Sequence, residues 1–77
     1  MSNKLREKFL LQANEVLSGK WEPKLLVTVV QLPSGGQEVA TNSSNIEEKI
    51  NYILENYDDD FRFKKSPQVQ VIGYILV

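Results

Sequence analysis

The apolar residues switch between helical and strand spacing along the chain, and the first spacing is helical. From about Ser2 to Ser18, apolar residues recur every three or four positions, which predicts an amphipathic helix. Gly19 is expected to end this helix in a left-handed conformation. Leu11 points away from the apolar stripe and is interpreted as a scattered surface residue or, alternatively, as a contact point for a partner. The stripe consists of Leu5, Phe9, Leu10, Ala13, Val16 and Leu17.

The longest aliphatic run, KLLVTVVQL at residues 24–32, lies between Pro23 and Pro33 and predicts a strand. Both its odd and its even positions are mostly apolar, whereas a strand with one wet face alternates. This strand is therefore expected inside a sheet that is covered on both faces, by helices on one and by something unidentified on the other. Trp21, just before the run, is expected to close one end of the core and less readily to serve as an interface residue.

A turn and a short polar strand follow. Residues 33–36, PSGG, carry paired glycines that suit the positive φ angles of hairpin turns. Gln37–Thr41 then predicts an antiparallel return strand with Val39 as its only large apolar residue. So polar a strand suits the edge of a sheet.

A second helix is predicted from about Asn45 to Asn56. Ser44 and Glu47 have the spacing of a capping box at its start. Tyr52 lies off the apolar stripe and is interpreted, like Leu11, as exposed. The stripe consists of Ile46, Ile50, Ile53, Leu54 and Tyr57.

Three carboxylates, Asp58, Asp59 and Asp60, follow this helix and are interpreted as a solvated acidic turn, since they lack the ligand spacing of a calcium loop. The next residues, Phe61, Arg62, Phe63, Lys64 and Lys65, alternate aromatic and basic types. Such alternation is typical of a third strand with both rings in the core. It also fits a single-stranded nucleic-acid contact, in which bases stack on rings beside cations.

The last predicted strand is Val69–Val77, after a turn at residues 66–68. It alternates at first and becomes apolar on both sides from Ile72 onward. Gly73 is expected to mark a bulge or a close approach of backbones.

These elements predict a single α+β domain over residues 1–77, in the order α-β-β-α-β-β. The simplest assembly is a four-stranded, mainly antiparallel sheet with both helices on one face and the two long strands adjacent at its centre. The second face would then carry apolar residues without cover, which indicates a protein interface. The residues predicted for that interface are Leu26, Val30, Leu32, Ile72, Tyr74 and Leu76.

The composition narrows the chemistry. The 77 residues include no cysteine and no histidine, so disulfides, thiolate metal sites and the commonest general base are excluded. Nine basic and ten acidic residues give a net charge of −1, which provides no overall attraction to nucleic acid or to an anionic membrane. No catalytic residue, cofactor or metal is predicted. The charged N-terminus and the lack of a long apolar run favour the cytoplasm.

The sequence therefore favours a small non-enzymatic protein that acts through protein–protein contacts. Its first partner is expected to be a second copy of itself, in a homodimer formed by packing of sheet faces or by edge pairing of strands. A regulator, an inhibitor or a phage or prophage accessory protein fits, the last because seven lysines and six asparagines are typical of low-GC bacterial or phage genomes. The alternative is a single-stranded nucleic-acid-binding protein that uses Phe61–Lys65. Nucleic-acid affinity falls steeply with salt, and that separates the two hypotheses.

Overall fold

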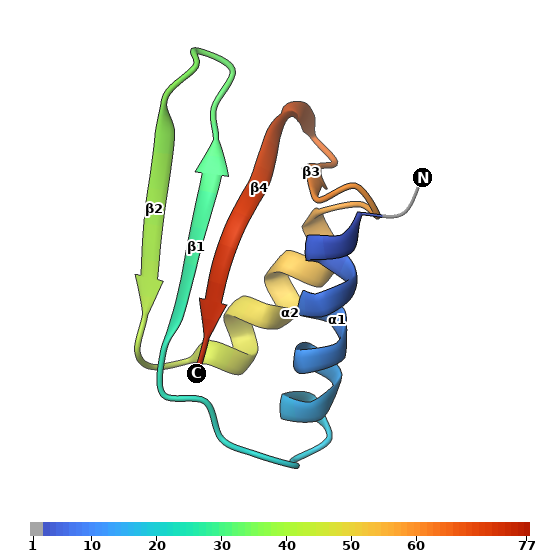
Figure 1. The fold of residues 1–77 in the computed structure, drawn as a ribbon, viewed down its shortest axis with the longest axis vertical. Coiled ribbons are helices and arrows are strands. Elements are labelled where there is room, and N and C mark those ends of the chain that lie inside the picture. The colour runs from blue at the N-terminus through green and yellow to red at the C-terminus, as the bar shows by residue number, and fades with distance from the viewer. Residues whose placement is uncertain (1–2) are drawn as a thin grey trace.

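The computed structural model describes residues 3–77, and its elements follow the predicted order (Figure 1). Ser2, at the predicted start of the first helix, lies outside the described residues. The elements are α1 (Lys4–Leu17), β1 (Leu26–Gln31), β2 (Gln37–Asn42), α2 (Ile46–Asn56), β3 (Arg62–Phe63) and β4 (Ser66–Leu76).

The four strands form one antiparallel sheet in the order β2-β1-β4-β3. The two long strands, β1 and β4, lie together at the centre, and β2 is an edge strand, as the sequence predicts. Leu26 is opposite Leu76 and Val29 is opposite Gly73, but Val30 is opposite Val71. Ile72 is therefore the extra residue of a β-bulge. Of the two features expected at Gly73, a bulge or a close approach of backbones, the structure shows a bulge directly beside it.

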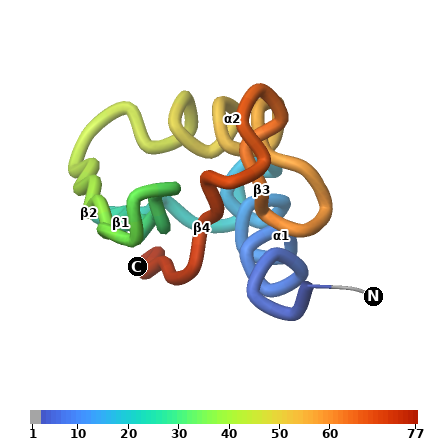
Figure 2. Tube along the Cα trace, turned by 90° about the horizontal axis from the view of Figure 1, so that it is seen from above, coloured from blue at the N-terminus to red at the C-terminus, as the bar shows by residue number. Residues whose placement is uncertain are grey.

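Both helices pack on one face of this sheet, and the core lies between the two layers (Figures 1 and 2). Phe9 of α1 is at its centre, fully buried, with its ring 5.5 Å from that of Phe61 and 5.1 Å from that of Tyr74. Edge-on aromatic contacts of this kind add to the stabilisation from burial alone. The buried apolar residues are Phe9, Ala13, Val16, Leu26, Ile46, Ile50, Ile53, Phe61, Val71 and Leu76.

Both ends of α1 are defined by hydrogen bonds. The Asn3 side chain accepts the Arg6 backbone N–H at 3.0 Å and caps the first turn. At the other end Gly19 has a φ of 83°, and the Lys20 N–H donates to the Glu15 carbonyl at 2.9 Å. This is the left-handed C-terminal cap predicted at Gly19.

The start of α2 differs from the prediction. The N-cap is Asn45, not Ser44, and it has a left-handed backbone with a φ of 54° and no capping bond from its side chain. Asparagine tolerates this conformation better than other residues with a side chain. The spacing of Ser44 and Glu47 could not reveal it, because the backbone angle is set by the tight passage from β2 into α2.

The third and fourth strands also differ from the prediction. β3 has only two residues, and β4 begins at Ser66, so the turn falls at Lys64–Lys65 and not at residues 66–68. Pro67 lies one residue inside β4, near a strand start, where a missing N–H is tolerated. The sequence signal of a proline turn was therefore misleading here.

The packing of Phe9 gives the first prediction. Phe9→Ala should lower the free energy of unfolding by about 3–5 kcal/mol, because it removes a buried ring and leaves a cavity between α1 and the sheet. Leu11→Ala on the same helix should change it by less than about 0.5 kcal/mol, since Leu11 is exposed. Urea unfolding measures both, and equal effects would contradict the packing described.

Tyr74 gives a pH prediction. Burial raises the pKa of its hydroxyl, which donates a hydrogen bond to the Gln12 side chain. A raised pKa means that the folded state favours the neutral hydroxyl. The stability that Tyr74 contributes is therefore complete below the pKa of the unfolded chain, about 10, and is lost as the pH rises through the pKa of the folded protein. Tyr74→Phe should therefore lose less stability than the wild type above pH 10 in urea unfolding. Parallel pH profiles would contradict this.

Candidate interaction surface

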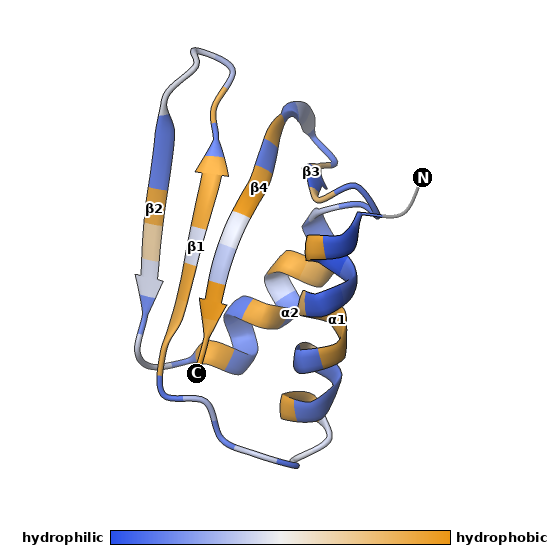
Figure 3. Ribbon diagram, in the orientation of Figure 1, coloured by the Kyte–Doolittle hydropathy of each residue, from blue (hydrophilic) through white to orange (hydrophobic). Residues whose placement is uncertain are grey.

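The side of the sheet that faces away from the helices carries a group of aliphatic side chains outside the core. We call it the helix-free face. Its residues alternate with the buried Leu26, Thr28 and Leu76 or lie opposite one another in the strand register. They are the apolar or small Val27, Val29, Val39, Gly73 and Ile75 and the polar Gln31, Gln37 and Thr41. Figure 3 shows apolar residues along most of β1, in parts of β4 and in the middle of β2.

Several side chains of this region are well exposed. The exposed fraction is 63% for Val39, 55% for Ile75, 60% for Val77 and 41% for the bulge residue Ile72. Val27 and Val29 between them are half-buried by their neighbours on the sheet. A group of exposed aliphatic side chains on one sheet face is typical of a surface that contacts another molecule.

The residues predicted for the interface lie mostly on the other side. Leu26 and Leu76 are buried in the core, and Val30 and Tyr74 pack against it. Leu32 is half-buried, and Ile72 alone of the six is well exposed. The predicted pairing of β1 with β4 is confirmed, but the helices cover the face that was predicted to be free. The bulge also places Ile72 on the other side of the sheet from Tyr74 and Leu76.

The two edges of the sheet are unequal. At one edge β3 is two residues long and is followed directly by Lys64 and Lys65. At the other, β2 is six residues long, and Figure 1 shows nothing beyond it. Short length and positive charge protect an edge from pairing, so β2 is the open edge.

The segment Phe61–Lys65 does not form the alternating strand that the sequence suggested. Phe61 precedes β3 with a φ of 61°, and its ring is 1% exposed in the core. Phe63 is half-buried and packs against Tyr57, with ring centroids 5.3 Å apart. The Phe61 ring is therefore not available to stack on a base, although Lys64 and Lys65 are exposed.

Asp58 has a structural role in this loop. One of its carboxylate oxygens accepts the backbone N–H groups of Asp60 at 2.9 Å and Arg62 at 3.0 Å. Its carbonyl accepts the Phe61 N–H at 2.9 Å. These bonds hold the left-handed Phe61 in place, which the acidic run alone did not indicate. Asp59 is 96% exposed, and its ion pair with Arg6 at 3.6 Å contributes little.

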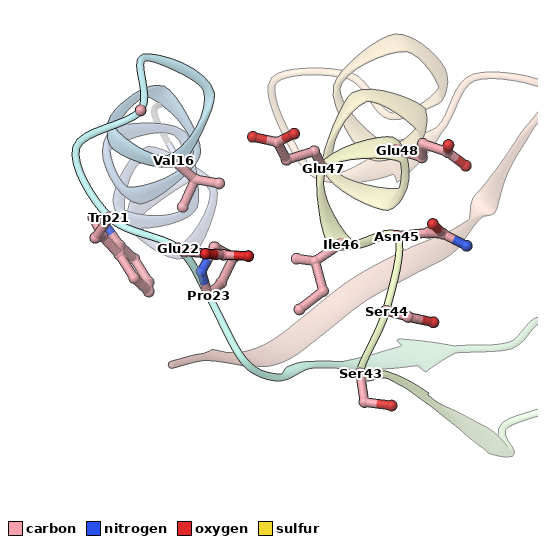
Figure 4. A pocket seen from close by; sticks show the side chains of 11 residues that line it. Val16, Trp21, Glu22, Pro23, Ser43, Ser44, Asn45, Ile46, Glu47 and Glu48 are labelled. Carbon is pink, nitrogen blue, oxygen red and sulfur yellow. The ribbon is translucent and has the colours of Figure 1, made fainter.

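A groove of about 590 Å³ lies between the end of α1 and the start of α2 (Figure 4). Trp21 is half-buried against the core there, as predicted, and its indole N–H donates to the Glu15 carboxylate at 3.1 Å. Glu22 and Glu47 face the space from opposite sides (Figure 4). Glu47 also lies in the first turn of α2, where a carboxylate complements the helix dipole. The helix dipole thus explains the carboxylates of Glu47 and Glu48 in this lining.

A smaller groove of about 230 Å³ lies on the helix side of the sheet, between α2 and the β1–β2 hairpin. Tyr57 lines it, and burial, followed by the nearby Tyr52 and Glu38, raises the pKa of its hydroxyl. The hydroxyl is therefore neutral at physiological pH. The lining contains no histidine and no cysteine, since the sequence has neither.

Comparison with known proteins gives no relative: no protein-family model, curated protein or solved structure matches the chain. Residues 3–77 contain no cluster of three or more side chains that could hold a metal ion. In the same part of the chain, no helix is long and apolar enough to cross a membrane.

The role of Asp58 is testable against its neighbour. Asp58→Ala should lower the free energy of unfolding by about 1–2 kcal/mol, because two backbone N–H groups lose their acceptor. Asp59→Ala should change it by less than about 0.5 kcal/mol. Asp58→Asn keeps one acceptor oxygen and should fall between them. Thermal or urea unfolding checks the order, and a larger effect at Asp59 would contradict it.

Proposed function

We propose that this chain is a small non-enzymatic interaction protein that acts through protein–protein contacts, with a second copy of itself as its first partner. A regulator, an inhibitor or an accessory protein of phage or prophage type, working in the cytoplasm, fits this role. The proposal includes no catalysis, cofactor or metal.

The observation that carries the proposal is the exposed aliphatic surface of the helix-free face. The two helices cover the opposite side, so their apolar stripes cannot shield Val39 or Ile75. Full burial of a valine or isoleucine side chain contributes about 1.5–3 kcal/mol. For a domain of 77 residues, whose net stability is small, covering several such side chains is a substantial gain.

The open edge of β2 supports self-association as well. Val39 belongs both to this edge and to the helix-free face. A second copy that packs on the face would cover its side chain, and one that pairs with the edge would place its own strand beside it. Leu11, by contrast, is exposed on α1, away from both. These two residues therefore provide a matched pair for a test.

We expect the wild type to sediment as a dimer in equilibrium with monomer at high micromolar concentration. Val39→Lys should weaken the dimer by roughly tenfold or more, because the loss of one buried valine exceeds the 1.4 kcal/mol that a factor of ten requires. Leu11→Lys should leave it unchanged. The dimer should depend little on salt, as an apolar contact does.

Sedimentation equilibrium of the three proteins, with circular dichroism to confirm folding, makes the measurement. A wild type that stays monomeric at high micromolar concentration would remove the proposal. Equal weakening by the two lysine variants would show that association does not involve this surface.

A further inference from the structure

Hydrogen bonding alternates along the central strand β1. Leu25 and Val77 exchange two backbone hydrogen bonds, each at 3.0 Å, so the odd-numbered residues of β1 bond toward β4. The Leu32 N–H donates to the Gly36 carbonyl at 2.8 Å, so the even-numbered residues bond toward β2. This alternation is the normal pattern of an antiparallel sheet.

The same alternation determines which backbone groups of β2 are unpaired. Val30 is opposite Glu38 and Thr28 is opposite Ala40, so the even residues of β2 bond to β1. The N–H and C=O groups of Gln37, Val39 and Thr41 then point to the open edge. Their side chains share the helix-free face, and all three are exposed.

The β2 edge lacks most of the features that prevent an edge strand from pairing with another chain. β2 contains no lysine, arginine or proline, pairs with β1 without a bulge, and has a single charge at Glu38. The other edge is blunted by the shortness of β3 and by Lys64 and Lys65. Within residues 3–77, only one edge of the sheet is therefore suited to accept a further strand.

We infer that β2 pairs with β2 of a second copy, antiparallel and centred on Val39. This deepens the proposed function and rests on it. A strand that pairs with itself antiparallel needs only one surface, which meets its own image across a twofold axis. Because each molecule has one open edge, the pairing closes as a dimer and does not propagate into a fibre.

The register follows from the unpaired groups. When the pairing is centred on Val39, Val39 lies opposite the partner's Val39 and Gln37 lies opposite the partner's Thr41. The outward-facing backbone groups of Gln37, Val39 and Thr41 then all form hydrogen bonds to the partner. Each such pair exchanges two hydrogen bonds. A centre at Glu38 or at Ala40 bonds one fewer pair within the strand. A centre at Glu38 also places like charges opposite each other, which is unfavourable. The Val39 register sets Glu38 opposite the partner's Ala40.

The resulting dimer has one continuous sheet of eight strands, two copies of the four found here, with all the helices on the same side. The two helix-free faces join at Val39 into one surface, which leaves Ile75 uncovered. Dimers formed by edge pairing and by face packing therefore depend on different residues. Edge pairing needs Val39 and not Ile75, whereas face packing needs both.

Single-cysteine variants test the register directly, because the chain has no cysteine of its own. Paired Cα atoms at a bonded site are about 5.5 Å apart, within the range that a disulfide spans. Val39→Cys should form a disulfide-linked dimer under mild oxidation roughly tenfold or more faster than Leu11→Cys, whose exposed thiol reports random collision. Glu38→Cys and Ala40→Cys should react no faster than Leu11→Cys.

A second set of cysteine variants leaves Val39, the centre of the proposed pairing, unchanged. A mixture of Gln37→Cys and Thr41→Cys proteins should form the mixed disulfide, while each alone should crosslink no faster than Leu11→Cys. Ile75→Lys should leave the sedimentation equilibrium of the dimer unchanged.

The outcomes separate the inference from the proposed function. Fastest crosslinking at Glu38→Cys or Ala40→Cys would overturn the register. A wild type that sediments as a dimer, with no β2 variant crosslinking above the collision rate, would overturn edge pairing and leave the proposed function standing. A wild-type monomer at high micromolar concentration would overturn both.

Discussion

The pairing of β1 with β4 determines most of what this protein presents to its surroundings. It joins two strands that are distant in sequence, and its last bonded pair is Leu25 with Val77. Because side chains alternate along paired strands, this one register decides which residues enter the core and which do not. Leu26 and Leu76 face the helices together, while Val27 and Ile75 face away together.

Two short helices can cover only one side of such a sheet. Phe9 and the apolar stripes of both helices meet the even-numbered side of β1, and the aliphatic residues on the odd-numbered side have no second layer. The two edges of the sheet also differ. The edge strand β3 has two residues and is followed by lysines, whereas the edge strand β2 has six residues with backbone groups that no further strand pairs. The exposed aliphatic side chains and the unpaired edge are thus a consequence of how few elements the described residues form.

Local residue patterns in the sequence are sufficient to predict much of this fold. Helical spacing, the glycine cap at Gly19 and the turn before Gln37 predict the element order, and the length of the two aliphatic strands predicts their central position. The side covered by the helices could not be predicted, because both sides of β1 are apolar and the choice depends on contacts between distant elements. The smaller Gly73 and the polar Gln31 on the odd side were the available signals.

Other features depend on backbone angles that no residue pattern encodes. Phe61 holds a left-handed conformation, normally costly by about 1–2 kcal/mol for such a residue, because Asp58 fixes the loop and the ring is buried. The bulge at Ile72 shifts the face of every residue before it on β4. These two features explain why the aromatic segment forms a strand of only two residues, and why Ile72 does not lie on the same side as Tyr74 and Leu76.

The central claim is that the bare edge of β2 is completed by a second copy of the chain. Amide hydrogen exchange by NMR, measured across a concentration series, tests this at single residues. The amides of Glu38 and Ala40 should be protected at every concentration, since they bond to β1, while those of Gln37, Val39 and Thr41 should gain protection only as the dimer forms. Fast exchange at Val39 under conditions where the protein is dimeric would contradict the account.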